Sequence, residues 1–555
     1  MSEWRGSIAL VNPPYAIGRS YHLAPPLGLQ VLAGALKSEG VEDVTIHDLA
    51  LELAEGTLPA GPALLDAAAA RLAAIAADVY GFSLQCFNLP IAIAVAERLR
   101  RLQPDARIVA GGHHATLLGT LLTKRFPCFD AVFSGPGEAT VGRRTFAPPD
   151  FDSGPAWSRY ASVSRQAVGL VEVGRGCPFD CSFCSIPVSF GRHIQHRPAD
   201  AVVADIAHLA SIGCTDVHLV DDILTVDPRY MDDLLSALTS ARLDVTWTAM
   251  SRVDLVSPHL LERMHAAGCR SILYGVESAD PGTRRLISKR AHRYPDLLQF
   301  ANDHTSIGIQ PTMYFLINVP GESEAGLRRT LDAASRISVI DPGACHFNLP
   351  RFVSGTALAA EAAGRLTPHS GTPYADTLVA TVGIECGEVW RTIDDHVDLC
   401  STYCVAPGPV DTDTAVAIAW VGGRLFERFP LTTARLAEAA DPIAVFRRLG
   451  MARRGREWAS ITDEELAALL NDLRDSATGD LGSLLDFEAW RASDGEAAGA
   501  DASYFVSSVD VAEARLAASD PDRSIGPALF GRARVYRRSG TSLRNQEGGD
   551  GAWQR

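Results

Sequence analysis

The chain has 555 residues, of which 47% are hydrophobic and 21% are charged, and its formal net charge is -15. This length can bury sizeable cores and suggests about two to four domains. The acidic balance disfavours duplex nucleic acid as the main partner, because phosphate contact needs a basic face. Eleven cysteines, an odd number and mostly scattered, do not resemble a disulfide framework, so we expect a reducing compartment.

Nothing in the sequence predicts membrane insertion. The first apolar run is short and is followed by Pro13 and Pro14, so it is typical of a strand rather than a signal peptide. The alanine-rich stretch 64–80 is interrupted by charged residues, which argues against a membrane span. We therefore expect a cytoplasmic protein without nucleic-acid or membrane partners.

Residues 1–145 show the alternating strand and helix pattern of an open parallel sheet. The expected strands are Ile8–Val11, Val44–His47, Val79–Phe82, Ile108–Ala110 and Ala131–Phe133, and the expected helices are Leu27–Glu39, Ala63–Ala77 and Leu89–Leu102. Ligands bind beyond the carboxyl ends of such strands. The candidate contacts are therefore Asn12, Pro14, Ser83, Leu84, Gln85, Gly111, Gly112, His113 and Gly135. An ordinary flavodoxin-like or nucleotide-binding sheet fits these residues equally well.

A loop with three cysteines follows an expected linker at 146–165, which is rich in Pro, Ser, Asp and Gly. Cys177, Cys181 and Cys184 stand in the spacing Cys-x3-Cys-x2-Cys after an apolar strand. Three thiolates can hold three irons of a [4Fe-4S] cube and leave the fourth iron open for chemistry. Core cysteines or half of a zinc site are the alternatives, but no fourth Cys or His follows at zinc-finger spacing.

This loop resembles the signature of the radical S-adenosylmethionine (SAM) superfamily, and residues 1–145 resemble the cobalamin-binding domain of its B12-dependent class. The second resemblance rests on Asn-Pro-Pro after the first strand, Gly-Phe-Ser at the third and Gly-Gly-His-His-Ala-Thr after the fourth. Together they imply a [4Fe-4S] cluster, SAM and cobalamin as cofactors. Methionine-synthase-like domains have a cobalt-ligating histidine where this chain has Asn12, Pro13 and Pro14, so we expect no imidazole ligand from that position.

Residues 166–370 continue the α/β pattern and resemble the partial (β/α)6 barrel of radical SAM enzymes. The expected strands are Leu170–Val173, Val217–Val220, Thr246–Met250, Ser271–Tyr274, Gln310–Leu316 and Cys345–Asn348. For Asp221 and Asp222 the resemblance implies SAM contact or ordering of the loop, with a helix N-cap as the alternative for Asp222. It implies a SAM carboxylate contact for Arg252, unless that residue is a solvated loop arginine. Glu277 is expected to contact the SAM amino group or to bind the open iron.

Two further residues are candidates for the substrate side of the site. Tyr314 alternates with its neighbours in the fifth strand and is a candidate base or substrate contact, although core packing is the commoner fate of such a tyrosine. Arg351, after the sixth strand, is a candidate anchor for an anionic group. The turn at 320–322, Pro-Gly-Glu, is expected to be structural.

The C-terminal region carries little chemical signal. Residues 371–538 are expected to form a mostly helical, substrate-binding cap over the barrel mouth, with helices at 415–429, 432–440, 464–474 and 511–518. Cys400 and Cys404 lack a third thiol nearby and are expected to be packing residues. Residues 539–555 are expected to be disordered.

This combination most resembles a cobalamin-dependent radical SAM methyltransferase. The resemblance implies methyl transfer from SAM, via methylcobalamin, to a carbon of a small molecule, supported by a flavodoxin-like or ferredoxin-like reducing system. The substrate that we expect first is tryptophan, methylated at C2 in natural-product or antibiotic biosynthesis. The alternatives are a radical B12 methylase of a peptide, sugar or antibiotic core, and a B12 radical SAM cyclase or ring-contraction enzyme. A non-catalytic cobalamin sensor is more remote, because it would not need the three cysteines.

Overall fold

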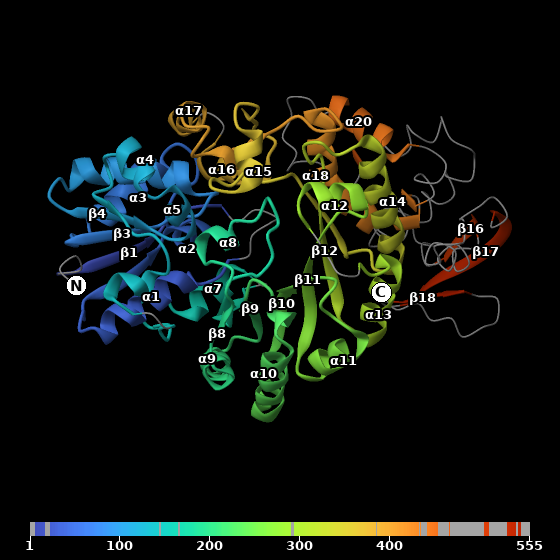
Figure 1. Cartoon of the computed structure of the whole chain (residues 1–555), viewed down its shortest axis with the longest axis horizontal. Helices are drawn as coiled ribbons and strands as arrows, with labels where there is room; N and C mark the ends of the chain where they lie inside the picture. The colour runs from blue at the N-terminus through green and yellow to red at the C-terminus, as the bar shows by residue number, and fades with distance from the viewer. Residues whose placement is uncertain are drawn as a thin grey trace. The chain divides into compact units, whose positions relative to one another are not determined.

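Five parallel strands form the first sheet of the computed structural model, in the order β2-β1-β3-β4-β5. Each strand lies within one residue of its expected bounds: β1 (Ile8–Asn12), β2 (Val44–Asp48), β3 (Val79–Ser83), β4 (Arg107–Gly111) and β5 (Ala131–Val132). Two helices cover one face, α3 (Leu64–Ala73) and α4 (Leu89–Leu102), and α1 (Leu27–Ser38) covers the other (Figure 1). This strand order reverses direction between β1 and β3, where such sheets bind ligands.

The chain divides into two units. The first contains Met1–Ile272, Ile287–Lys289 and Pro350–Ala406, and the second contains Leu273–Leu286, Arg290–Leu349 and Pro407–Arg555. The structure describes residues 6–16, 23–143, 146–164, 167–289, 294–383, 386–431, 433–434, 441–452, 465–466, 504–509, 530–539 and 542–545. In these ranges no helix is both long and apolar enough to cross a membrane.

The first sheet sends alternate side chains into two apolar cores. Ala9 and Val11 of β1 are buried in the core that also contains α3 and α4, whereas Ile8 and Leu10 are buried in the core beneath α1. Because both faces of the sheet are covered, its inner strands β1 and β3 are almost continuously buried, whereas burial alternates in the edge strand β2. The buried apolar surface supplies the main driving force for folding of this layer.

The segment after the first sheet packs against that sheet. In α7 (Trp157–Val163), the buried Tyr160 donates a hydrogen bond from its hydroxyl to Asp48 Oδ2 at 2.8 Å. Arg159 forms two hydrogen bonds with the Glu55 carboxylate, at 2.6 and 2.8 Å. The same Asp48 accepts hydrogen bonds from the first amides of α2 (Leu49–Ala54). α7 is therefore held against the first sheet by one buried hydrogen bond and two partly buried ones.

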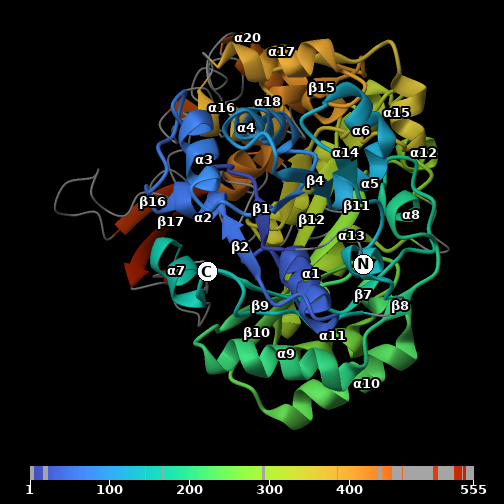
Figure 2. The ribbon, with the colours of Figure 1, turned by 90° about the vertical axis from the view of Figure 1, so that its left-hand side faces the viewer.

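Three further parallel strands of the first unit lie in the order β6-β9-β10. They are β6 (Gly169–Glu172), β9 (Asp216–Val220) and β10 (Thr246–Ser251). Two helices, α9 (Ala199–Ser211) and α10 (Pro228–Ala241), lie side by side next to these strands (Figure 2). After β6 the short strands β7 (Gly174–Arg175) and β8 (Gln195–His196) pair with each other. They enclose residues 176–194, which contain the three cysteines and are called the cysteine loop below.

The segment Pro350–Ala406 also belongs to the first unit. Its helices α16 (Pro373–Val382) and α17 (Gly387–Asp395) bury apolar side chains in the core that contains α4. Arg98 of α4 donates a hydrogen bond to Glu388 of α17 at 2.7 Å. Cys400 and Cys404 are buried thiols, as a packing role requires. An amphipathic pattern predicts that a helix buries one face, but it does not identify the partner.

The second unit contains β12 (Gln310–Leu316) and β13 (Cys345–Asn348), which pair in parallel. The preceding strand, β11 (Cys269–Glu277), begins in the first unit and ends in the second. All six strands expected for the partial barrel are thus present. Phe426 of α18 (Thr412–Arg428) packs its ring against Phe347 of β13, with 5.5 Å between the ring centroids.

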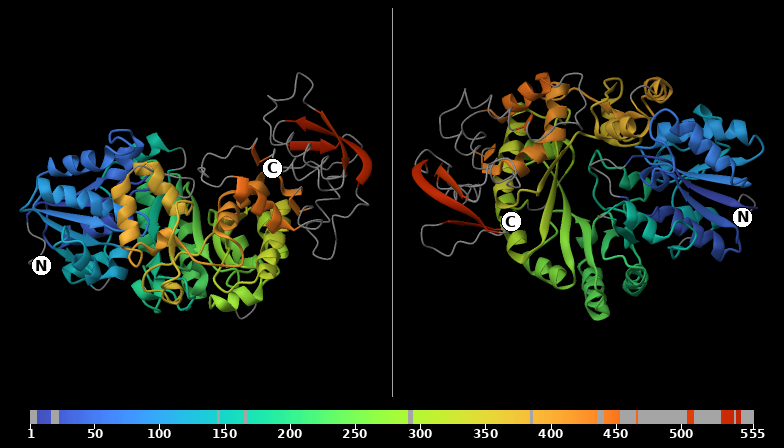
Figure 3. Two further views of the ribbon diagram at one scale, coloured as in Figure 1. Left: turned by 90° about the horizontal axis from the view of Figure 1, so that it is seen from above. Right: turned by 180° about the vertical axis from the view of Figure 1, so that it is seen from behind.

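The C-terminal region combines helices with a small sheet. After α18 comes α20 (Pro442–Ala452), whereas the helices expected at 432–440, 464–474 and 511–518 lie almost entirely outside the described residues. Further on, β16 (Tyr504–Val509), β17 (Phe530–Ser539) and β18 (Ser542–Asn545) form an antiparallel sheet, drawn in red in Figure 3. The predicted disorder after residue 538 is wrong at Ser542–Asn545, because pairing with β17 orders a segment whose composition alone is typical of disorder.

Gly34 of α1 permits a close approach that can be tested. A Cβ at Gly34 would lie 2.1 Å from the backbone oxygen of Pro148, so Gly34→Ala must displace the segment that packs on α1. We expect this change to destabilise the first unit by about 1–3 kcal/mol. The matched control is Gly28→Ala in the same helix, where a Cβ would meet nothing within 4 Å and should be neutral or stabilising. Thermal unfolding of the full chain measures both, and equal melting temperatures would contradict the close approach.

Candidate functional site

A cavity of about 490 Å³ opens at the carboxyl ends of the first sheet. Its volume lies in the range of small-molecule sites. Seven of the nine residues predicted after these strands line it: Asn12, Ser83, Gln85, Gly111, Gly112, His113 and Gly135. The other two, Pro14 and Leu84, are buried and are not part of the lining. The strand-end rule therefore located this cavity from the sequence.

The opposite wall of the cavity comes from the second sheet and from the cysteine loop. Glu172 of β6, Val220 of β9, Arg175 of β7 and Phe190 of the loop all line it. These residues belong to the first unit, like those of the first wall. One cavity therefore contacts both the first sheet and the segment that carries the cysteines.

Paired glycines shape the first wall. Gly112 has a φ of 92°, and a Cβ there would lie 3.0 Å from Leu84 O and 3.2 Å from Ser83 Oγ. Both the backbone angle and the limited space therefore favour glycine. Asn12 is held by a hydrogen bond from its Nδ2 to Asp48 Oδ1 at 2.8 Å. The wall thus presents backbone and small polar groups, which suit a large cofactor that needs close approach.

The two histidines after β4 differ in environment. His113 Nε2 lies 2.8 Å from Ser185 Oγ, one residue beyond Cys184, and burial lowers the pKa of His113. His114 is fully buried, its Nε2 lies 3.2 Å from Leu399 O, and burial lowers its pKa to about 4. His113 therefore joins the first sheet to the cysteine loop, whereas His114 belongs to the core.

An ion-pair network that the sequence did not reveal connects the two walls. Arg175 Nη1 donates to Glu138 Oε1 at 2.6 Å, and its Nε and Nη2 donate to the Glu172 carboxylate at 2.5 and 2.8 Å. The guanidinium also lies over the rings of Phe146 and Phe190, with 4.7 and 5.9 Å to the ring centroids. A glutamate within the apolar strand β6 was the one available signal, because such residues are rarely buried unless paired.

The cysteine loop carries the donor set of an iron–sulfur cluster. Cys177 is buried, and Cys181 and Cys184 are half-buried. Burial, together with the nearby thiols of Cys181 and Cys177, raises the pKa of Cys184 to about 12. In the described part of the chain no three His, Cys, Asp or Glu side chains stand at ligand distances from one metal ion. Three clustered thiols on one short loop fit the cluster chemically.

Two of the site residues predicted at the ends of β9 and β10 contact this loop. Asp222 Oδ2 accepts a hydrogen bond from Gly176 N at 2.7 Å and so contacts the start of the loop, whereas the N-cap of α10 is Asp227. Arg252 is buried, bonds Asp254 at 2.9 and 3.1 Å, and lies 3.8 Å from the ring centroid of Phe179 within the loop. The alternative of a solvated loop arginine is therefore wrong.

Arg351 lies in the first unit at the end of a row of aromatic rings. Its exposed guanidinium is 4.6 Å from the ring centroid of Tyr374. Tyr374 is 5.9 Å from Phe87, which in turn is 5.0 Å from Tyr15, measured between ring centroids. Phe87 and Tyr15 both line the cavity, so this row of rings extends from the cavity to the guanidinium of Arg351.

The second unit holds the remaining two predicted site residues. Glu277 ends β11, is 6% exposed and has a φ of 67°. For a residue other than glycine this left-handed conformation is strained, and such strain is concentrated at functional sites. Tyr314 is half-buried on β12, between the core residues Met313 and Phe315, and its ring centroid is 5.3 Å from that of His346. Tyr314 therefore faces away from the core that its neighbours enter.

The Pro-Gly-Glu turn at 320–322, after β12, connects neighbouring segments through its glutamate. Glu322 accepts hydrogen bonds from Val319 N at 3.2 Å and from Thr283 Oγ1 at 3.1 Å. Burial raises the pKa of Glu322 to about 7, although these two hydrogen bonds oppose the shift. The carboxylate thus joins the turn after β12 to α12 (Pro281–Leu286), the helix that follows β11, as a structural role requires.

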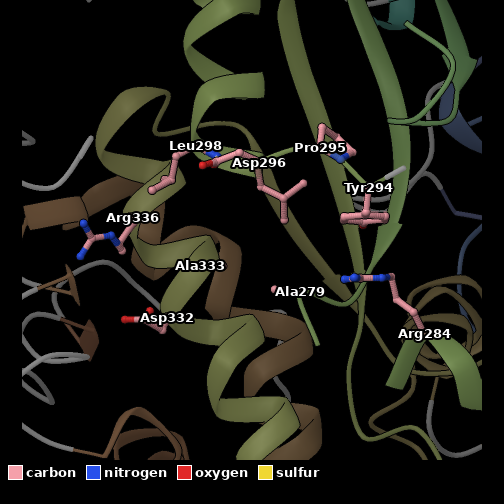
Figure 4. A pocket seen from close by; sticks show the side chains of 10 residues that line it. Ala279, Arg284, Tyr294, Pro295, Asp296, Leu298, Asp332, Ala333 and Arg336 are labelled. Atoms are coloured by element: carbon pink, nitrogen blue, oxygen red, sulfur yellow. The ribbon is translucent and has the colours of Figure 1, made fainter. Parts of the chain in front are cut away.

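A second cavity, of about 410 Å³, lies within the second unit (Figure 4). In its lining the Arg284 guanidinium lies against the Tyr294 ring, 3.7 Å from the centroid, and donates to Ser278 O at 2.7 Å. Neither Glu277 nor Tyr314 lines this cavity. It contains none of the residues that the sequence singled out.

Two family models match the chain. The model described as B12 binding domain matches residues 15–143, and the model described as Radical SAM superfamily matches residues 171–334. An uncharacterised methyltransferase of Pyrococcus horikoshii is 26% identical over 374 residues, which cover 60% of this chain and 78% of that protein. The radical SAM match supports the expected [4Fe-4S] cluster and SAM, and the B12-binding match supports the expected cobalamin.

Solved structures share the fold. The radical SAM methyltransferase TsrM of Kitasatospora setae, with tryptophan substrate and a SAM analogue bound, matches with a TM-score of 0.56 at 17% identity, over 84% of this chain and 99% of that one. The cobalamin-dependent SAM radical enzyme OxsB matches with a TM-score of 0.55 at 12% identity, over 87% and 80%. The predicted architecture, with a cobalamin-binding domain before a radical SAM domain, is confirmed.

Gly112 provides a test of the cobalamin cavity. Gly112→Ala adds a methyl group against Leu84 O at a positive φ, so we expect cobalamin binding to weaken about tenfold or more, or roughly 1.4 kcal/mol. The control is Gly40→Ala, at a glycine that also has a positive φ, 84°, but lies outside the cavity lining, and where a Cβ would meet nothing within 4 Å. Titration followed by cobalamin absorbance measures both affinities. Equal affinities in the two variants would show that the cofactor lies elsewhere.

Glu322 predicts a pH dependence of stability. Its folded-state pKa of about 7 lies above the usual 4.5, so the folded state binds this proton more tightly than the unfolded state. Stability from this group is therefore full below pH 4.5 and falls by up to roughly 3 kcal/mol as the pH rises to about 7. Glu322→Gln should flatten this dependence, and Glu324→Gln, at a nearby half-buried glutamate whose side chain is 42% exposed, should not. The free energy of unfolding is measured with denaturant between pH 5 and 8. Identical pH profiles for the wild type and Glu322→Gln would show that Glu322 does not cause the dependence.

Proposed function

Because the chain belongs to the cobalamin-dependent radical SAM methyltransferases, we propose that it transfers a methyl group to a carbon atom of a small aromatic molecule bearing an anionic group. Its cofactors are a [4Fe-4S] cluster, SAM and cobalamin. Tryptophan, methylated at C2 of the indole ring, is the first candidate, since a structural relative was solved with tryptophan as substrate. A role in natural-product biosynthesis is part of this proposal.

The shared cavity is the observation that carries the proposal. Its first wall provides Asn12, Ser83 and the paired glycines for cobalamin, and its second wall reaches the cysteine loop. When bound, cobalamin supplies a cobalt ion that can carry a methyl group, and the cluster supplies an iron that can hold SAM. A single cavity between their binding segments suits the passage of a methyl group from one cofactor to the other.

Residues of the chain set the environment of both cofactors. Cys177, Cys181 and Cys184 are the proposed ligands of the cluster, and Asp222 fixes the start of their loop through Gly176 N. His113 fixes the loop near its third cysteine through Ser185. We assign His113 this holding role rather than cobalt ligation, and the segment after β1 offers Asn12 and two prolines rather than an imidazole.

The row of rings that ends at Arg351 supports an aromatic, anionic substrate. Tyr15, Phe87 and Tyr374 offer ring faces and edges, and aromatic pairs of this kind add attraction beyond the area that they bury. Arg351 provides a planar guanidinium that suits a carboxylate. An aromatic amino acid meets both requirements. A neutral aliphatic substrate would use neither.

A proton acceptor is the remaining requirement for methylation at an indole carbon. The ring becomes a better nucleophile when its N1 proton is withdrawn, and the proton on C2 must leave after the new bond forms. Tyr314 and Glu277 are the proposed candidates, because each places an ionisable group at a strand that a radical SAM barrel uses for chemistry. Burial lowers the pKa of His346 beside Tyr314, which favours a neutral ring there.

Product analysis tests the proposal. The protein, reconstituted anaerobically with cluster and cobalamin, is incubated with SAM, a reductant and tryptophan. We expect 2-methyltryptophan without stoichiometric 5'-deoxyadenosine. Stoichiometric 5'-deoxyadenosine would instead indicate a radical methylase, and a product without added methyl mass would indicate a cyclase or ring-contraction enzyme. Absence of any product from tryptophan would overturn the substrate assignment.

Arg351 tests the substrate class within the same assay. Arg351→Ala should raise the KM for tryptophan about tenfold or more and change kcat less, because the lost contact binds substrate and transition state alike. The control is Arg365→Ala, an exposed arginine of the same unit that donates to Glu361 O. Tryptamine, which lacks the carboxylate, should be an equally poor substrate for wild type and Arg351→Ala. An unchanged KM in Arg351→Ala would remove Arg351 from the site.

A further inference from the structure

Four buried polar atoms without a hydrogen-bond partner lie at the base of the cysteine loop. They are Nδ1 and Nε2 of His196, Oδ2 of Asp221 and the hydroxyl oxygen of Tyr230. Such atoms are uncommon in folded proteins, because each one costs about 1–3 kcal/mol when left unpaired. A cluster of them at one place next to a candidate site therefore requires an explanation.

The three side chains come from three elements that meet behind the loop. His196 ends β8, Asp221 follows β9, and Tyr230 lies in α10. The His196 ring stacks on the Tyr230 ring, with 4.0 Å between centroids and 7° between planes. His196 Nδ1 lies 3.6 Å from Asp221 Oδ2, and the exposed fractions of the two side chains are 12% and 2%. A small rotation of either side chain closes this gap to hydrogen-bond length.

Gly174 leaves the space in which this pair can form. It lies opposite His196 in the β7–β8 pairing. A Cβ at Gly174 would lie 2.5 Å from Asp221 Oδ2 and 2.9 Å from His196 Nδ1, so a larger residue would displace both groups. The glycine thus fits a direct contact between the carboxylate and the ring.

The two neighbouring aspartates reach opposite ends of the cysteine loop. Asp222 accepts the hydrogen bond from Gly176 N, at the first residue of the loop. Asp221 faces His196, which pairs with Gly174 and follows Gln195, the first residue after the loop. Asp221 is itself held by a hydrogen bond from Ile223 N to its Oδ1 at 2.8 Å. One turn after β9 can therefore hold both ends of the loop.

We propose that His196 donates a hydrogen bond from Nδ1 to Asp221 and thereby closes the cysteine loop. His196 is then a positioning residue for Cys177, Cys181 and Cys184, with the Tyr230 ring fixing the plane of the imidazole. Groups that orient metal ligands from behind commonly change metal affinity or activity by 10- to 100-fold. This inference concerns how the loop is held, so it does not depend on which substrate is methylated.

Two substitutions at His196 separate hydrogen bonding from packing. His196→Leu removes both ring nitrogens, whereas His196→Asn keeps a side-chain N–H in a position close to Nδ1. The matched control is His208→Leu, because His208 also stacks on an aromatic ring, Phe151, at 4.7 Å, but belongs to α9 outside the loop. The full chain, reconstituted anaerobically with cluster and cobalamin, is used throughout.

The rate of amide hydrogen exchange in peptides from 176–194 measures how firmly the cysteine loop is held. The affinity for SAM measures whether the cluster bound by this loop is correctly positioned. In His196→Leu we expect amide exchange in this loop to accelerate and SAM binding to weaken about tenfold, with cobalamin affinity retained. His196→Asn should restore both to within about twofold of the wild type, and His208→Leu should change neither. In His196→Leu combined with Asp221→Asn, the effects should be less than additive, because both changes remove the same bond.

Three results would overturn the proposal. Wild-type exchange and SAM affinity in His196→Leu would show that the pair does not hold the loop. Failure of His196→Asn to restore them would assign the effect to ring packing on Tyr230. An equal loss of cobalamin affinity and melting temperature in both His196 variants would assign the residue to folding of the whole unit rather than to the loop.

Discussion

Arg175, bonded at once to Glu138 and Glu172, joins the first sheet to the strand that leads into the cysteine loop. All three side chains are at least 86% buried, so the desolvation penalty is large, and loss of one partner would leave an uncompensated charge. The guanidinium also lies over the rings of Phe146 and Phe190, of which Phe190 lines the cavity. The distance between the wall that suits cobalamin and the loop that suits the cluster depends on this network.

The cysteine loop is held at several points by groups from outside it. Asp222 bonds Gly176, His113 bonds Ser185, and Arg252 lies over Phe179. Each contact comes from a different strand end, so the loop takes its shape from the sheets rather than from its own sequence. A loop fixed in this way needs little reorganisation when it binds a cofactor, which is how precise sites are built on rigid elements.

Much of this arrangement followed from the sequence, because strand periodicity and strand-end position are local signals. Residues such as Ser83 and Gly112 were located by the rule that parallel strands present their ligands at the carboxyl ends. Arg175 and His196 were not, because their importance depends on partners distant in sequence, Glu138 and Asp221. The helices α16 and α17 were not predicted, and their packing on α4 could not be, since an amphipathic pattern marks a buried face without identifying what covers it. β18 was missed because only its pairing with β17 distinguishes it from a disordered tail.

The return of Pro350–Ala406 to the first unit has a consequence for synthesis. As the chain leaves the ribosome, α4 emerges long before α16 and α17, the helices that complete its apolar core. The intervening segment Arg290–Leu349 belongs to the other unit and is made in between. The two units must therefore mature in an interleaved order rather than one after the other. Until residue 406 has emerged, the nascent chain exposes an apolar face that is a natural target for chaperones.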